Sequence, residues 1–501
     1  MRRAAVLCTA LALAGCSVGP DYRRPDLVPP PAYRGAPPAP AASEGYDPAH
    51  WWRALHDREL DSLVERALHD SPTLAIALAH LQQARTIEMA YTGAELPRGG
   101  AVSGGGRGTG SDLVRGRVPA SLGSADHTIT GLPHIDRASG LDAVWDIDIF
   151  GRVRRQIEAA SYDAAVSAAA RDEAQVAVIA ELVRTYASLR GGQMLRDVEE
   201  QNIAVTKSQV DLLQARFDRG LTNEFDVTLA KRQYATLHAQ LPGISSRILA
   251  DEEAIAALLG RYGADLAPEL DAPGLLPAVP ERVTTGTPID LLRRRPDVRA
   301  AEWQLAGATA RVGIAVGNLF PQLALNAGTG VQGEGIGWQP TAQQRIWSVG
   351  YTAALPLLDF GLLDAQVKVA DLQARIELTR YRAAVQAAVQ EVDSSLAEYG
   401  AQQQRLRDLD EAVAASRRAT ELATQRYERG LSDFLNVIDA QRQQYDLAAQ
   451  YVEAQAAAVT QFAGLARALG GGWEGFEEPS TPRPLPAVMA LLGRTTGWTS
   501  P

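Results

Sequence analysis

Three aspartates form the densest group of side chains in this sequence that could bind a metal ion or act as acid and base. They are Asp142, Asp146 and Asp148. Apolar residues take the alternate positions around them: Leu141, Ala143, Trp145, Ile147 and Ile149. This period of two predicts a strand with one acidic and one apolar face. We expect the carboxylates to face a water-filled space, with a metal or acid–base cluster as the alternative.

Other motifs of enzymes are missing or stand in the wrong context. The sequence has no HExxH zinc motif, no GxSxG nucleophile motif and no paired cysteine and histidine, and its 7 histidines are scattered. Residues 328–333 fit the GxGxxG pattern of dinucleotide sites, but they lie in a predicted strand with no helix after it. We therefore predict no enzyme, no catalytic residue, no cofactor and no metal site.

Cys16 is predicted to carry a covalent lipid. Basic Met1-Arg2-Arg3 is followed by apolar residues 4–12 and then by Leu13-Ala14-Gly15-Cys16, which matches the bacterial lipobox. The pattern predicts that residues 1–15 are a signal peptide and that Cys16 becomes acylated, and Ser17 resembles the residue found in lipoproteins sorted to the outer membrane. The alternative is an ordinary secretory signal with a chance cysteine.

Composition limits the possible partners. The 501 residues are 46% hydrophobic but only 6% aromatic, so small side chains that suit long, closely packed helices dominate. The net charge of −10 argues against binding to nucleic acid. Cys8 and Cys16 are the two cysteines, so no disulfide is expected in the mature chain. No later stretch reaches the roughly 18 apolar residues of a membrane helix, so strands would have to cross any membrane.

A segment of 18 residues occurs twice. Residues 216–233 and 426–443 share eight identities at an offset of 210. The shared residues of the first copy are Arg216, Arg219, Gly220, Leu221, Val227, Ala230, Arg232 and Gln233. Each glycine suits a left-handed helix end, and Thr222 or Ser432 could cap the next helix. Each copy is therefore predicted to form the tip of an antiparallel helical hairpin.

The rest of the chain repeats in the same order. Pro72 and Pro296 correspond at an offset of 224, and Phe150 and Phe360 at 210. The expected parts are an acylated proline-rich strap at 16–50, a first repeat at 51–263, a linker at 264–288, a second repeat at 289–469 and a poorly ordered tail at 470–501. Each repeat is expected to hold a β-hairpin, a long helix, a tip and a return helix. The hairpins are placed at about 97–150 and 321–360, and the long helices at 152–219 and 362–429.

These elements predict a conduit made of several copies. Four strands of about ten residues with one lipid-compatible face cannot close a barrel, and open edges are not tolerated in lipid. Three copies would supply twelve strands and a closed cylinder of helices. The predicted fold is a mixed α/β membrane protein: a trimeric 12-stranded transmembrane β-barrel continuous with a long periplasmic α-helical barrel. The alternative is a structural periplasmic coiled coil that conducts no ions.

The sequence resembles the TolC-like outer-membrane factors, specifically the lipoprotein (NodT/OprM-like) subunits of tripartite efflux pumps. The resemblance covers nearly the whole chain. The motifs that carry it are Cys16–Pro25, Trp51-Trp52, Trp145–Arg152, Arg294–Glu302, Phe320-Pro321, Asp359-Phe360-Gly361 and Gly470–Trp473. The glycine-rich residues 98–110 are unusual for a first barrel strand.

The resemblance implies a function and partners. The chain is expected to be the outer-membrane exit duct of a multidrug or xenobiotic efflux system in a Gram-negative bacterium, lipid-anchored and extending into the periplasm. It is expected to form a homotrimer that works with a periplasmic adaptor and an inner-membrane RND-type pump, and to contact outer-membrane lipid. Related ducts for heavy-metal cations or for type I protein secretion remain alternatives, since an acidic lumen does not select among cations.

The resemblance also assigns residues at the tips. Leu435 and Asp439 correspond to the family's periplasmic gate, where three apolar groups and three carboxylates line the constriction. The first tip has Phe225 and Leu229 at these positions, so only the second tip has an acid there.

Two further sets of tip residues follow from the resemblance. Tyr427 and Asp226 are the candidates for a polar lock that holds the tip closed. Gly220 and Leu221, with Gly430 and Leu431, stand where the family contacts its adaptor. The alternative for Asp439 is an ordinary acidic residue on a solvated helix face. The alternative for the glycines is that they only serve the turn.

Overall fold

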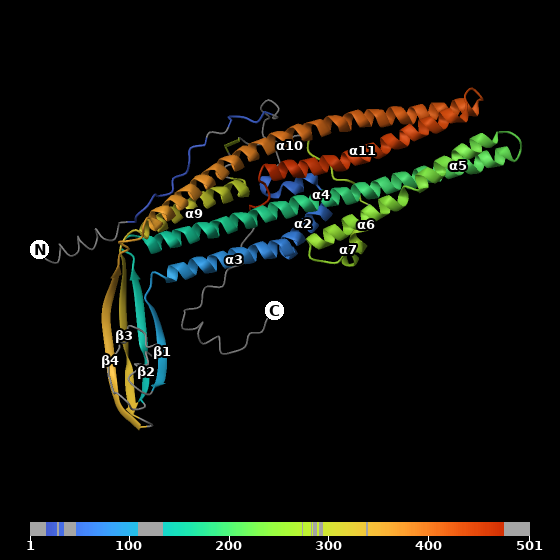
Figure 1. Ribbon diagram of the computed structural model, residues 1–501. Coiled ribbons are helices and arrows are strands. Elements are labelled where there is room, and N and C mark those ends of the chain that lie inside the picture. The colour runs from blue at the N-terminus through green and yellow to red at the C-terminus, as the bar shows by residue number, and fades with distance from the viewer. Residues whose placement is uncertain are drawn as a thin grey trace.

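The computed structural model describes residues 17–27, 30–34, 47–108, 134–272, 274–281, 283, 288–289, 294–336 and 339–474. The expected signal peptide, Cys16 and most of the expected tail lie outside these residues. Long helices run side by side, and a four-stranded sheet extends from one end of them (Figure 1). Within these ranges no helix combines the length and the apolar character needed to cross a membrane.

The sheet is antiparallel throughout, in the order β1-β2-β3-β4. The strands are β1 Arg98–Gly108, β2 His134–Ile147, β3 Gln322–Ile336 and β4 Gln339–Ala354. Leu141 pairs with Thr329, and Thr329 pairs with Trp347, so the apolar positions of three strands share one face. Leu141 and Trp347 are 60% and 79% exposed. The predicted alternation is confirmed, and the apolar face is open.

The three aspartates do not form one cluster. Because β2 ends at Ile147, Asp148 lies beyond the strand, and its Oδ2 accepts the backbone N–H of Arg154 at 2.9 Å. Asp148 thereby serves the first turn of the next helix, where unpaired N–H groups favour a carboxylate. Asp146 remains on the strand and pairs with Arg98 at 3.0 Å. The expectation that Asp148 belongs to the acidic face of the strand is therefore wrong.

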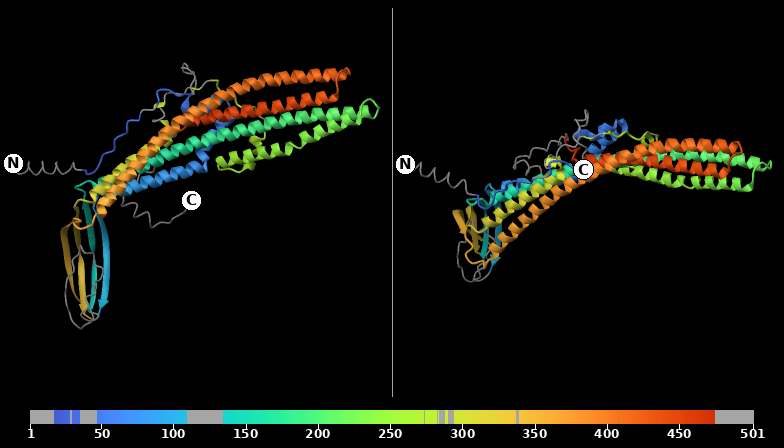
Figure 2. Two further views of the ribbon diagram at one scale, coloured as in Figure 1. Left: turned by 45° about the horizontal axis from the view of Figure 1, so that its top comes forward. Right: turned by 90° about the horizontal axis from the view of Figure 1, so that it is seen from above.

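Two helical hairpins make up most of the molecule. The first joins α4 Arg152–Phe217 to α5 Glu224–His238 and α6 Leu241–Leu258, and the second joins α10 Leu362–Glu428 to α11 Phe434–Ala468. At about 1.5 Å per residue the two long helices reach roughly 100 Å. α4 packs against α11, so the hairpins lie side by side in both views of Figure 2.

Shorter helices surround the half of α4 that is nearer the sheet. α3 Pro72–Gly93 and α9 Pro296–Gly317 pack along α4, and α9 also packs against α10. Three small elements complete the order: η1 Pro48–Leu55, α2 Arg58–Asp70 and α7 Gly263–Leu270.

Three expected boundaries need correction. The first return helix is divided into α5 and α6, because Pro242 in the first turn of α6 lacks the N–H needed to continue α5. The expected linker begins with α7, whose Leu266 and Leu270 are buried in the core, so packing outweighs the proline content. η1 begins inside the expected strap, with Pro48 in its first turn and Asp47 as its N-cap.

The main core lies where the hairpins meet the shorter helices. It gathers Trp51 and Trp52 of η1 with Leu182 and Tyr186 of α4 and Phe462 of α11. The described part of the N-terminal strap is held to the same region by charge. Buried Arg155 pairs with Asp21 at 2.6 Å, and Glu302 pairs with Arg24 at 2.8 Å.

Candidate gate at the hairpin tips

Both hairpin turns use glycine in the left-handed conformation. Gly220 has φ +70° and Gly430 has φ +71°. The next N–H in each turn reaches back to the helix: Leu221 donates to the Arg216 carbonyl at 2.9 Å, and Leu431 donates to the Arg426 carbonyl at 2.8 Å. This 6→1 bond closes the helix end and satisfies its last carbonyls. The prediction for the two glycines is confirmed.

The predicted helix caps are wrong by one residue. Asn223 is the N-cap of α5, and its side chain accepts the N–H of Asp226 at 2.9 Å. Asp433 occupies the N-cap position of α11, where its side chain makes no capping hydrogen bond. Asn and Asp are as good caps as Thr and Ser, and they stand next to the helix. The hydroxyl of Thr222 instead donates to Asp226 at 2.9 Å.

A small apolar cluster joins the two hairpins just behind the turns. This tip cluster contains Val210, Leu213, Val227, Leu229, Ala230, Phe434, Val437 and Ile438. Its members come from α4, α5 and α11, and Tyr427 of α10 packs against it. Because the cluster buries apolar side chains from both hairpins, it stabilises the position of one hairpin relative to the other.

The candidate gate residues lie on one exposed face of α11. Leu435 is 51% exposed, and Asp439 follows it by one helical turn. Asp439 pairs with Arg442 at 3.3 Å and accepts from Gln443 at 3.4 Å. Arg442 was not identified from the sequence as the partner of Asp439, although their i,i+3 spacing on a predicted helix could have indicated it.

The first tip presents a different pair. Phe225 is 63% exposed, like Leu435, whereas Leu229 is 8% exposed in the tip cluster. Within the described chain the corresponding faces of the two tips therefore differ in charge and in burial.

The structure does not bring the expected lock residues into hydrogen-bond contact. The Tyr427 ring lies 5.2 Å from the ring of Phe434, centroid to centroid, and Asp226 bonds to Thr222 and Asn223. The expected adaptor-contacting leucines are prominent, because Leu221 and Leu431 are 71% and 65% exposed.

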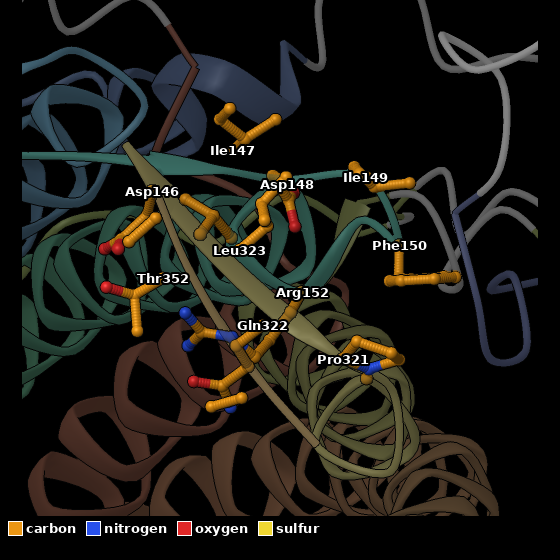
Figure 3. A pocket seen from close by; sticks show the side chains of 14 residues that line it. Asp146, Ile147, Asp148, Ile149, Phe150, Arg152, Pro321, Gln322, Leu323 and Thr352 are labelled. Carbon is orange, nitrogen blue, oxygen red and sulfur yellow. The ribbon is translucent and has the colours of Figure 1, made fainter. Parts of the chain in front are cut away.

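A second polar site lies where the sheet meets the helices. A cavity of about 190 Å³ is lined by residues of β2, β3, β4, α4 and α9, including Asp146, Asp148 and Gln322 (Figure 3). Asp146 and Asp148 are already paired with Arg98 and Arg154. Phe150 also lines this cavity, and its ring stacks on the ring of Phe320 with the centroids 4.8 Å apart. We regard this site as the structural junction of sheet and helices. Across the described residues, no group of His, Cys, Asp and Glu could hold a metal ion.

Comparison with known proteins agrees with this geometry. The family model described as outer membrane efflux protein matches residues 63–261 and 288–471. A probable efflux pump outer membrane protein, TtgC of Pseudomonas putida, is 29% identical over 472 residues, covering 93% of this chain and 94% of that protein. Nodulation protein T of Rhizobium leguminosarum is 27% identical over 448 residues, covering 86% and 89%.

Solved structures share the fold. The outer-membrane channel OprN superposes with a TM-score of 0.79 at 32% identity, covering 91% of this chain and 100% of that chain. The Neisseria gonorrhoeae outer membrane channel MtrE, solved in its open state, gives a TM-score of 0.78 at 24% identity, covering 91% and 99%. At that identity MtrE supports the fold alone.

Proposed function

The chain belongs to the outer membrane efflux protein family, and on that basis we propose that it forms the exit duct of a tripartite efflux system for drugs or other xenobiotics. It is an outer-membrane protein, as are its relatives in efflux pumps. The observation that carries the proposal is the sheet, which has one apolar exposed face, two open edge strands, β1 and β4, and long helices leading away from it.

Closure of the duct requires further copies of the chain. Four strands are too few for a closed barrel, and lipid does not tolerate the unpaired edges of β1 and β4. A homotrimer would give twelve strands, an even number within the usual range of outer-membrane barrels. The same three copies would place three pairs of hairpins around one axis and so continue the pore into the periplasm.

The gate in this proposal is a ring at the second tip. Three copies of Leu435 would narrow the pore with apolar groups, which exclude hydrated ions by dewetting. Three copies of Asp439 would add carboxylates that attract cations to the mouth. The exposed face shared by both residues supports this assignment. The lock between Tyr427 and Asp226 would require a rearrangement of the tip, because each residue has other contacts here.

Opening would be driven from outside the chain. Leu221 and Leu431, each beside its turn glycine, offer an apolar surface for a periplasmic adaptor, which would couple the duct to an inner-membrane RND-type pump. Acylated Cys16 would add a lipid anchor to the outer membrane.

Adaptor docking is tested at the two exposed leucines. Cells that lack the chain, complemented with Leu221→Asp/Leu431→Asp, should accumulate a fluorescent amphiphilic dye as fully as uncomplemented cells, because charges replace the apolar docking surface. The matched control, Leu221→Met/Leu431→Met, keeps that surface and should restore export. Export by the aspartate variant at the wild-type rate would remove the tips from adaptor docking. Equal dye levels with and without the wild-type chain would contradict the efflux function.

A further inference from the structure

The contact between the two hairpins contains a buried carboxyl that the gate does not use. Glu199 lies on α4 where this helix packs against α11, and it is 4% exposed. Its Oε2 atom and the nearby Asn202 Nδ2 atom are buried without a hydrogen-bond partner. Buried polar groups are normally paired, so two unpaired atoms one helical turn apart on α4 need an explanation.

Electrostatics disfavour the charged form of this carboxyl. Burial, and then the negative charge of Asp446 on α11, raise the pKa of Glu199 above its ordinary value. Tyr445 of α11 lies beside it, and among the described residues no cation of α4, α5, α6 or α11 offsets the charge. An ionised carboxylate in this place would be buried, unpaired and next to another carboxylate, which is strongly unfavourable.

The internal repeat shows that the fold does not require this arrangement. At the offset of 210, Glu199 and Asn202 correspond to Leu409 and Ala412 of α10, and Asp446 corresponds to Thr236 of α5. The equivalent helices, α10 and α5, therefore carry no charge at these positions. The acidic pair is a feature of the α4–α11 contact alone.

We propose that Glu199 is a proton-operated latch between the two hairpins, which holds α11 against α4 while it is protonated and releases α11 when it is ionised. Asp439 of the proposed gate lies seven residues before Asp446 on the same helix, so release of α11 would free the gate. The gating consequence rests on the proposed duct function, whereas the latch itself does not.

The direction of the pH dependence follows from proton binding. The closed contact binds the Glu199 proton more tightly than the open contact, in which the carboxyl meets water. Raising the pH above the ordinary range of a glutamate therefore favours opening, by at most about tenfold per pH unit for one carboxyl. The effect levels off once the pH exceeds the pKa of Glu199 in the closed contact.

A thiol reporter tests the latch without reference to any pore. Asn202→Cys places a thiol in the contact, and exposed Glu200→Cys on the same helix serves as the matched control for the pH dependence of thiol chemistry itself. The ratio of their maleimide labelling rates in purified full-length protein, measured from pH 5 to pH 8, should rise several-fold. In a Glu199→Gln background, which cannot ionise, the ratio should stay flat.

Two outcomes would overturn the latch. One is a flat ratio in the protein that retains Glu199, and the other is a rise that persists in Glu199→Gln. If Asn202→Cys fails to fold, Thr206→Cys reports on the same contact, because Thr206 lies one turn further along the same face and is 1% exposed. Either result stands whether or not the protein conducts ions, so failure of the latch is distinguishable from failure of the duct.

Discussion

At the scale of single residues, Arg190 on α4 is the least exposed charged residue in the part of the chain that the structure describes. It is 1% exposed, pairs with Glu59, and donates to the Ala272 carbonyl at 2.6 Å. Its guanidinium thus joins α4 to α2 and to the segment after α7. Six residues earlier on the same helix, Arg184 pairs with Glu181 in solvent, where both side chains are about half exposed.

These two arginines give a matched stability test. Arg190→Met should lower the free energy of unfolding by about 3–5 kcal/mol, because it leaves the Glu59 carboxylate without its cation and the Ala272 carbonyl without its donor beside the core. Arg184→Met should lower it by less than about 1 kcal/mol, since exposed ion pairs contribute little. Denaturant unfolding followed by circular dichroism measures both. Equal losses for the two variants would show that burial does not set the contribution of Arg190.

The turns show how far residue-level prediction reaches. Gly220 and Gly430 were predictable because few other residues adopt a left-handed helix end. The caps were not, because Thr222 and Asn223 both suit that role and only the geometry of the turn decides between them. Asp148 was misplaced for a similar reason, since alternation does not show where a strand ends and a helix begins.

At the scale of elements, the repeat and the strand registers agree. Arg98 pairs with Val144 in the first hairpin, and Gln322 pairs with Ala354 in the second, as the offsets of 224 and 210 require. In β2 and β3, Trp145 faces Leu325. In a trimer, β4 and β1 of the next copy would form the counterpart of this pairing. The same offsets would place Leu355 opposite Ala101 of that copy.

Exposed side chains support this pairing between copies. Phe150 stacks on Phe320 within the chain at 4.8 Å. The equivalent residues, Phe360 and Leu96, are 98% and 65% exposed and lie at opposite edges of the sheet. Contact between them across the subunit boundary would bury both, as the repeat already does inside the chain.

The register is tested by cross-linking. In purified protein, Leu355→Cys combined with Ala101→Cys should form an intermolecular disulfide on oxidation and give a covalent trimer in denaturing gels. Leu355→Cys with Val102→Cys is the control, because Val102 belongs to the other face of β1. A covalent trimer from the control pair alone would show that the register between copies differs from the one inside the chain.

At the scale of the whole molecule, the sequence predicted the architecture better than the boundaries. Alternation of Trp347, Val349 and Tyr351 with polar residues identified one face of the sheet, and that face is open in the structure. The linker was mispredicted because α7 depends on burial of Leu266 and Leu270, which composition does not show. The unpaired Glu199 was not recognised because only the packing of α4 on α11 reveals it.

The central claim is a conduit that narrows at the second tip, and single-channel conductance in planar bilayers tests it most directly. Wild type should show a small conductance. Leu435→Ala/Asp439→Ala should raise it several-fold, because both rings are removed from the constriction. Phe225→Ala, at the corresponding exposed position of the first tip, should leave the conductance unchanged. Silence of the wild type and of the double variant alike would contradict the account.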